Sequence, residues 1–363
     1  MLTRLYVDNF RCFVNFEYRP RQRELILGAN GSGKSTFLDV LLLLRQIAVN
    51  GVAVDDLPML ANRTRWMQQP EIVFELDADL DGLFHYRLVI APTQDPLRQH
   101  VAEETVHFKN SPLLRFSEGN VQTFNDRGEL VASFSFDPRR SAFAVLGAGN
   151  TGLGRLKTWL TDLCCFRINP FTIAPAAPTE ALGPNVDLSN FVAWYRHLVQ
   201  AQPRENRSFL RSLEQSIEGL RYLPAEPVGI NNVVLAAEFD GGQKGRVYLN
   251  ELSDGQRCLI GLYAILHFVV AKGRTVVIDE PDNFIALREI QPWLVALDDA
   301  VEESRGQVMI ISHHPEILNQ WAPSSGTQFS RDGFGPVRVR RFEASPEPAL
   351  TAAELVSRGW DGT

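Results

Sequence analysis

The alternation of apolar and polar positions divides the chain into strand-like and helix-like stretches. Residues 2–10 and 12–18 alternate, which predicts two antiparallel strands. The apolar run 23–28 ends in glycine and predicts a buried strand, whereas the Leu-rich stretch 34–49 lacks proline and glycine and predicts a buried helix. Further alternating stretches within 71–137, separated by turn-forming residues, predict a β-rich layer.

The middle of the chain changes to helical spacing. Residues 153–220 predict helices that prolines interrupt. The first of these predicted helices includes Cys164, Cys165 and Phe166. No heptad pattern persists over three repeats, so we expect a compact helical insertion and no long coiled coil. After residue 225 strands alternate with helices, the latter at 254–271 and 284–303, which predicts a mostly parallel sheet covered by helices.

The composition fits an ordinary soluble globular protein, because 45% of the residues are hydrophobic, 22% are charged and the net charge is −7. A chain with this charge does not attract nucleic acid as a whole, so DNA binding would need a local basic patch. Solvated surface positions are the favoured interpretation of the basic clusters, and DNA as a partner stays undecided. The clusters are Arg139–Arg140 and Arg338, Arg340 and Arg341.

Cysteine usage and the absence of a recognisable leader predict a cytoplasmic protein. The four cysteines form no CxxC pair and are expected to be reduced, buried thiols. The longest apolar run, residues 258–271, is shorter than the roughly 20 residues needed to span a bilayer, and it contains His267. We therefore expect no membrane partner.

The segment Gly28–Ser35 has the spacing GxxxxGK[ST] between a predicted strand and a predicted helix. Glycines let such a loop curl so that its amides point at phosphate oxygens, and the helix N-terminus adds partial positive charge. Lys34 is predicted to reach the β- and γ-phosphates of ATP, and the Ser35 hydroxyl to ligate Mg²⁺. The residues predicted to contact the nucleotide in this segment are Gly31, Ser32, Gly33, Lys34, Ser35 and Thr36.

A pair of acids follows the apolar run 275–278. Asp279 and Glu280 stand at the carboxyl end of a predicted strand, where ligands of α/β sheets bind. Asp279 is predicted to hold Mg²⁺ through a water, and Glu280 to polarise the attacking water as a general base. A solvated acidic turn is the alternative for this segment alone, and the phosphate loop upstream favours the catalytic interpretation.

Two further motifs lie on either side of these acids. Ser253 and Gly255 open the predicted helix at 254–271, which is typical either of an anion site or of a simple helix N-cap. Their position shortly before the acidic strand favours the anion site. His313 follows another predicted strand and could hold the attacking water or sense the γ-phosphate, with a surface turn as the alternative.

In this order the motifs resemble the ABC-type P-loop ATPases, and most closely their RecF/SMC/OLD branch. The resemblance rests on NFRCF, GANGSGKST, LSDGQR, VVIDEPDN and ISHHPE, and it covers roughly residues 1–60 and 245–345. It implies an α/β P-loop NTPase fold of the ABC-ATPase head type, with a mixed, mostly parallel core sheet, an antiparallel β layer and a helical insertion. The expected domains are lobe I at 1–145, the insertion at 146–225 and lobe II at 226–363.

In that branch the nucleotide lies between two subunits, so the resemblance implies an ATP-dependent homodimer. Ser253, Gly255 and Gln256 would close over the γ-phosphate of the partner's ATP. The residues that the resemblance places on ATP in cis are Lys34, Ser35, Asp279, Glu280 and His313, with Asn30 and Arg11 near the phosphates.

The chain departs from the family pattern in two respects. Asp254 stands where the signature usually has glycine, and we expect its carboxylate to face away from the phosphate and to cap the helix. The glutamine loop has no local signal that would identify it, so Gln46, Gln68 and Gln69 stay open as candidates.

The expected function is binding and hydrolysis of Mg-ATP that closes and opens a dimer. This switch would gate DNA binding or an effector protein from a neighbouring gene, as in DNA repair or phage defence. An ATP-binding scaffold without turnover and a transporter ATPase subunit are the alternatives. The transporter subunit is disfavoured, because such subunits keep the phosphate loop close to the signature, whereas more than half of this chain separates Lys34 from Ser253.

Overall fold

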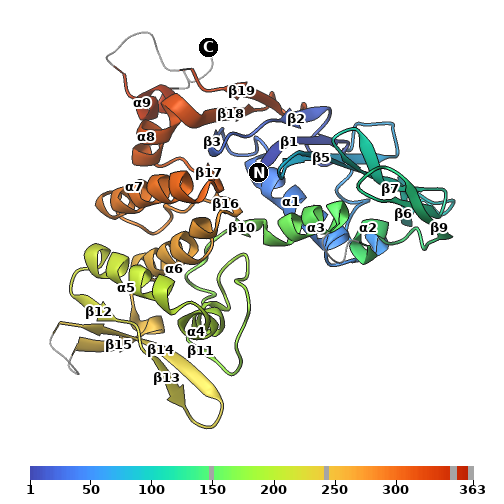
Figure 1. The fold of residues 1–363 in the computed structure, drawn as a ribbon. Helices are drawn as coiled ribbons and strands as arrows, with labels where there is room; N and C mark the ends of the chain where they lie inside the picture. The colour runs from blue at the N-terminus through green and yellow to red at the C-terminus, as the bar shows by residue number, and fades with distance from the viewer. Residues whose placement is uncertain (147–150, 241–244, 344–349, 359–363) are drawn as a thin grey trace. The chain divides into compact units, whose positions relative to one another are not determined.

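The computed structural model describes residues 1–146, 151–240, 245–343 and 350–358 (Figure 1). The chain divides into two compact units, and each is described by itself. Unit 1 comprises Met1–Leu163 and Gly326–Glu343, and unit 2 comprises Cys164–Ser325 together with residues 350–358. The expected boundaries after residues 145 and 225 stay a prediction.

Unit 1 contains an antiparallel sheet with the strand order β2-β1-β4-β5-β6-β7-β8-β9. Strand β4 illustrates how the sequence directs it, because Phe74, Leu76 and Ala78 alternate with more exposed residues and are fully buried. The strands are β1 (Leu2–Asp8), β2 (Phe16–Tyr18), β4 (Ile72–Asp79), β5 (Leu83–Pro92), β6 (Gln99–Phe108), β7 (Ser111–Ser117), β8 (Asn120–Phe124) and β9 (Leu130–Ser135). Beside them are η1 (Val54–Asp56), α2 (Ala142–Val145) and α3 (Gly152–Asp162).

The second part of unit 1 carries the glycine-rich loop. Strand β3 (Arg23–Leu27) lies parallel to β18 (Gly326–Ser330), which pairs antiparallel with β19 (Arg338–Arg341). Helix α1 (Lys34–Ala48) follows the loop after β3. The ring of Phe329 on β18 packs edge to face against Phe37 on α1 and Tyr18 on β2, so these elements share one aromatic core.

Unit 2 is built on three parallel strands, in the order β10 (Cys164–Phe166), β16 (Thr275–Asp279) and β17 (Gln307–Ile311). Every residue of these strands is buried, as is typical of a parallel sheet with both faces covered. The helices next to them in the chain are α6 (Asp254–Phe268), η4 (Val270–Lys272), α7 (Leu287–Ser304), α8 (Pro315–Ser325) and α9 (Ala352–Ser357).

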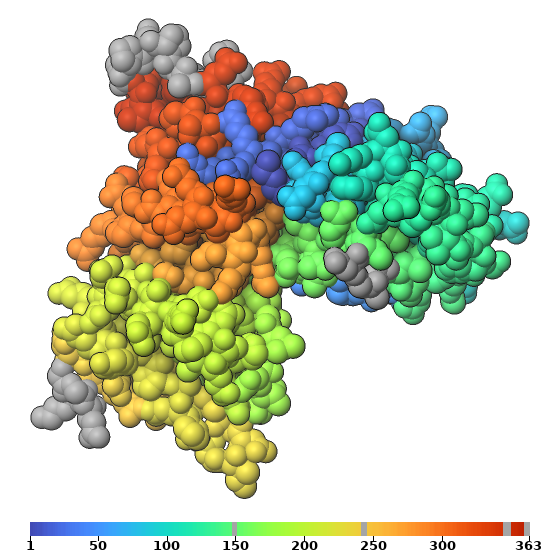
Figure 2. Space-filling model, in the orientation of Figure 1, coloured from blue at the N-terminus to red at the C-terminus, as the bar shows by residue number. Residues whose placement is uncertain are grey.

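The remainder of unit 2 is a helical pair and a small antiparallel sheet around β14. The hairpin of β13 and β14 projects from the unit (Figure 2), and Ile230 at its turn is 98% exposed. The elements are α4 (Phe191–Ala201), α5 (Pro203–Ser216), β11 (Ala176–Ala177), β12 (Leu220–Tyr222), β13 (Ala225–Val228), β14 (Asn232–Phe239), β15 (Arg246–Tyr248) and η3 (Leu249–Glu251).

Two sequence-based predictions of secondary structure were wrong in detail. Cys164, Cys165 and Phe166 form strand β10 and do not continue the preceding helix, because a three-residue apolar run has no periodicity of its own and pairing with β16 decides its state. Helix α7 begins at Leu287 and not at residue 284, because Phe284 has a φ of 73°.

The expected lack of a long coiled coil holds for the described residues, where α7 with 18 residues is the longest helix.

Candidate functional site

The glycine-rich loop of unit 1 turns sharply between β3 and α1. Gly28 has a φ of 144° and Gly33 a φ of 99°, in the region that favours glycine. A Cβ on Gly28 would overlap the Phe329 carbonyl oxygen, and one on Gly33 would lie 2.9 Å from the Phe13 ring. Glycine is therefore required at both positions by close approach as well as by backbone conformation.

Polar groups inside this loop are arranged for an anion. The Lys34 ammonium donates to the Gly28 carbonyl at 2.5 Å and to the Ala29 carbonyl at 3.0 Å. The Lys34 side chain therefore extends from the start of α1 to the first two residues of the loop. The Ser32 hydroxyl is buried and has no hydrogen-bond partner among the described residues, whereas Ser35 is exposed. A buried hydroxyl without a partner is costly, so the loop fits a ligand that supplies acceptors, such as a phosphate.

Thr36 and Arg11 are held close to this loop. The Thr36 hydroxyl lies 3.8 Å from the Cys12 sulfur, and the Arg11 guanidinium pairs with Asp39 on α1 at 2.5 Å and with the Asn62 side chain at 3.0 Å. Asn30 and Gly31 are exposed at the tip of the loop. The predicted phosphate-binding residues of unit 1 thus lie together, although the guanidinium of Arg11 is engaged by α1.

In unit 2 the carboxyl ends of the parallel strands lie at one edge. Asp279 ends β16, is 6% exposed and accepts a hydrogen bond of 2.9 Å from Arg167, which follows β10. Arg167 was missed from the sequence. The signal that could have identified Arg167 is its position directly after strand β10. This signal was not visible because the residues of β10 were predicted to be helical.

Glu280 and His313 lie at the same edge. The amide of Glu280 donates to the Ile311 carbonyl at 2.8 Å, and the Glu280 carboxylate accepts from the Asn283 side chain at 2.7 Å. Ser312, directly after β17, donates to Asp282 at 2.6 Å, which ties the loop after Glu280 to the end of β17. His313 is exposed beside this bond. Asp279, Glu280 and His313 thus lie at or directly after the carboxyl ends of β16 and β17, and their catalytic roles stay predictions.

The segment Ser253–Arg257 opens helix α6. Ser253 is the N-cap, and its hydroxyl accepts from the Gln256 amide at 3.2 Å while the Gln256 side chain accepts from the Ser253 amide at 3.0 Å. The expectation that Asp254 caps the helix was wrong, because Asp254 lies in the first turn and pairs with Arg257. The capping interpretation of Ser253 is confirmed, and its role as an anion site stays a prediction.

Unit 1 thus gathers the phosphate-loop residues, and unit 2 gathers the acids, the histidine and the signature residues. Mg²⁺ is usually held by one or two carboxylates together with substrate phosphates, and the assignment of Ser35 and Asp279 as its ligands stays a prediction. Among the described residues, no cluster of three or more His, Cys, Asp or Glu side chains could hold a metal ion.

Most of the other predicted features are surface positions. Gln46 lies on an exposed position of α1 and Gln68 and Gln69 lie exposed before β4, and nothing in these positions identifies the glutamine loop. Arg341 pairs with Glu24 at 2.8 Å, while Arg338 is exposed on β19.

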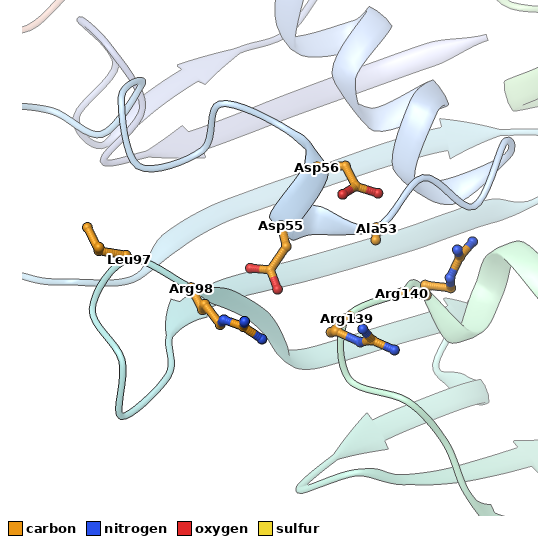
Figure 3. A pocket seen from close by; sticks show the side chains of 7 residues that line it. All are labelled: Ala53, Asp55, Asp56, Leu97, Arg98, Arg139 and Arg140. Carbon is orange, nitrogen blue, oxygen red and sulfur yellow. The ribbon is translucent and has the colours of Figure 1, made fainter.

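The cluster Arg139–Arg140 borders a pocket of about 400 Å³ in unit 1 (Figure 3). Asp55 and Asp56 line the same pocket, and Arg139 pairs with Asp137 at 2.8 Å. Acids therefore offset the arginines, which favours a solvated surface over a nucleic-acid contact.

All four cysteines are free and buried, as predicted. Burial raises the pKa of Cys258 on α6 to about 12, and the Asp254 carboxylate adds to the rise, so this thiol stays protonated. Of the helices in the described ranges, none is both long enough and apolar enough to cross a membrane.

Known proteins resemble this chain mainly in fold. Residues 179–319 match the family model described as an AAA domain, putative AbiEii toxin, Type IV TA system. A solved SMC head bound to the C-terminal winged-helix domain of ScpA has a TM-score of 0.58 at 14% identity, over 96% of this chain and 98% of that chain. No curated protein matches the sequence.

Two further solved structures are similar over most of their length. An SMC head with an extended coiled coil, bound to the C-terminal domain of ScpA derived from Pyrococcus furiosus, has a TM-score of 0.51 at 12% identity, over 94% of this chain and 96% of that chain. The SMC head domain from Thermotoga maritima has a TM-score of 0.49 at 16% identity, over 94% and 99%. The two likenesses to ScpA-bound heads show that this chain shares their fold.

Proposed function

Starting from the P-loop ATPase fold of the ABC/SMC branch, which this chain has, we propose that it binds and hydrolyses Mg-ATP in a head-to-tail dimer. The observation that carries the proposal is the loop of unit 1, where the Ser32 hydroxyl is buried without a partner beside Lys34 and the exposed Ser35. A triphosphate supplies the acceptors that this loop lacks.

The two sets of residues would act on one nucleotide. Loop amides and Lys34 hold the β- and γ-phosphates, and the N-terminus of α1 adds partial positive charge. Ser35 and Asp279 would hold Mg²⁺, which neutralises phosphate charge when bound. Glu280 accepts a proton from the attacking water, and the side-chain amide of Asn283, 2.7 Å away, fixes the orientation of its carboxylate. His313 orients the same water or senses the γ-phosphate.

The second copy completes the site in this proposal. Ser253, Gly255 and Gln256 at the start of α6 would meet the γ-phosphate held by the partner's loop, where the helix N-terminus favours an anion. ATP would then close the dimer, and hydrolysis would open it. The capping box of Ser253 and Gln256 stabilises the first turn of α6, which supports the proposal of an ordered helix N-terminus at this contact.

A protein effector is the partner that we propose for this switch. The two SMC heads that share its fold were solved bound to parts of the protein ScpA. A role in phage defence or DNA repair goes beyond this and depends on identifying the effector. DNA itself is disfavoured as the direct ligand, because acids offset the Arg139–Arg140 cluster and the net charge is −7.

Turnover by the Glu280→Gln variant tests the proposal. A general base contributes roughly 10²–10⁴-fold, so phosphate release should fall by at least about 100-fold while ATP binding persists. Lys34→Ala is the matched control and should lose ATP binding itself. Unchanged turnover in Glu280→Gln would contradict the catalytic role.

The ATP-binding scaffold is the alternative function. It predicts tight Mg-ATP binding by the wild-type protein with no phosphate release, so the same binding and release assays separate it from the ATPase.

A further inference from the structure

Two phenylalanine rings on unit 2 contact each other in an exposed position. Phe171 is 67% exposed and Phe284 is 50% exposed, and their ring centroids lie 5.4 Å apart in an edge-to-face arrangement. The rings come from separate segments, the loop after β10 and the loop before α7. Paired, exposed aromatic rings are uncommon on a monomer surface and are typical of protein contact sites.

The loop that carries Phe284 is held firmly in place. Phe284 has a φ of 73°, an unfavourable backbone conformation for a bulky residue. The segment around it is fixed by the Ser312–Asp282 bond of 2.6 Å and by a turn bond of 3.1 Å from the Ile285 amide to the Asp282 carbonyl. Neighbouring contacts thus hold the backbone in this conformation and keep the ring at the surface, which is common at functional sites.

The loop that carries Phe171 is fixed to the signature helix. The Phe171 amide donates to the Asn169 side chain at 3.0 Å, which forms a local turn. Arg257 on α6 donates to the Pro170 carbonyl at 2.7 Å and pairs with Asp254 as well. The residue before Phe171 is therefore bonded directly to the first turn of α6.

The loop that carries Phe284 also packs against the start of α6. A Cβ added to Gly255 would lie 2.7 Å from the Phe284 carbonyl oxygen, so glycine is needed there for the helix to approach this loop. The loops that carry both aromatic residues thus contact the first turn of α6, next to Ser253 and Gly255. Ser253, at the N-cap of α6, is exposed, and Gln256 in the first turn is partly exposed.

We propose that Phe171 and Phe284 form the apolar anchor by which unit 2 binds a second copy of the chain in the ATP-closed dimer. The inference rests on the proposed function, which brings the signature residues against the second copy. Two exposed aromatic side chains on loops that contact the first turn of α6 would then lie at the same contact. An aromatic side chain buries about 150–250 Å², and aromatic anchors of this size dominate the energetics of interfaces.

The test measures dimer dissociation by analytical ultracentrifugation in the Glu280→Gln background with Mg-ATP. Phe284→Gly removes the ring and suits the positive φ, and Phe171→Ala removes the other ring. Each should weaken the dimer about tenfold or more, while ATP binding by the monomer stays unchanged. Phe284→Tyr should restore most of the affinity. Because both rings are exposed, thermal melting of the monomer should change little.

Tyr222→Ala is the matched control, because Tyr222 is an aromatic residue of the same unit that is 62% exposed. Dimer affinities within twofold of the Glu280→Gln parent in both ring variants would overturn the anchor and leave the ATP-driven dimer intact. An equal loss in Tyr222→Ala would overturn it too. A Glu280→Gln protein that stays monomeric with Mg-ATP would overturn the proposed function and the anchor together.

Discussion

Acidification should destabilise unit 2 through one histidine on the signature helix. His267 on α6 lies 2.8 Å from the Ser212 hydroxyl on α5, and the Phe209 ring packs beside it. Burial lowers the pKa of His267 from 6.5 to about 4. The folded state therefore binds the proton less readily than the unfolded state does. The resulting stability is present above pH 6.5 and is lost as the pH falls towards 4.

The size of the effect follows from the two pKa values. Between pH 7 and pH 5 the unfolded histidine gains a proton and the folded one does not, which costs about 2 kcal/mol. The ring borders an open pocket of about 520 Å³ that Asp299 and Glu303 also line, so solvent screening reduces this towards about 1 kcal/mol.

Urea unfolding at pH 7 and pH 5, compared between wild type and His267→Gln, measures this loss. Glutamine can still bond Ser212 but does not titrate, and the comparison cancels the titration of Asp299 and Glu303. The wild type should lose about 1–2 kcal/mol more than the variant. Equal losses in the two proteins within about 0.5 kcal/mol, the usual additivity error, would refute the reasoning.

Two further predictions concern the proposed nucleotide site. Ser32→Ala removes a buried hydroxyl that has no hydrogen-bond partner among the described residues. The nucleotide-free variant should therefore melt at the same temperature as the wild type or higher, while its affinity for ATP falls. A lower melting temperature with unchanged ATP affinity would contradict a phosphate-binding role. Arg167→Ala removes the guanidinium that bonds the buried Asp279 carboxylate, and it should destabilise the metal-free protein by about 1–3 kcal/mol. Mg-ATP should recover part of this lost stability in thermal melting. Equal destabilisation with and without Mg-ATP would show that Asp279 does not bind the metal.

Local signals made the glycine loop predictable. Gly28 and Gly33 need positive φ values, and Lys34 begins a long apolar helix, so the residue types alone indicate a strand, a tight loop and a helix. Asp279 was predictable for a similar reason, because four successive buried residues of β16 lead to it. In both segments the sequence signal lies within a few neighbouring residues, although distant residues such as Phe329, beside Gly28, also contact them.

Short and context-dependent segments were not predictable in this way. The three apolar residues Cys164–Phe166 form a strand only because they pair with β16. Arg167, the next residue, then bonds Asp279, which is 112 residues away in the chain. The loop before α7 is similar, since its conformation depends on the bond from Ser312 to Asp282. No pattern within these segments encodes a partner that is distant in the chain.

The sequence by itself determined the fold class, the phosphate loop and the strand that delivers the acids, because apolar periodicity and glycine spacing are local properties. Only the tertiary structure decided that Arg167 pairs with Asp279 and that Phe171 lies against Phe284. The physical reason is that side-chain partners far apart in sequence are chosen by packing and burial, which depend on the whole folded unit.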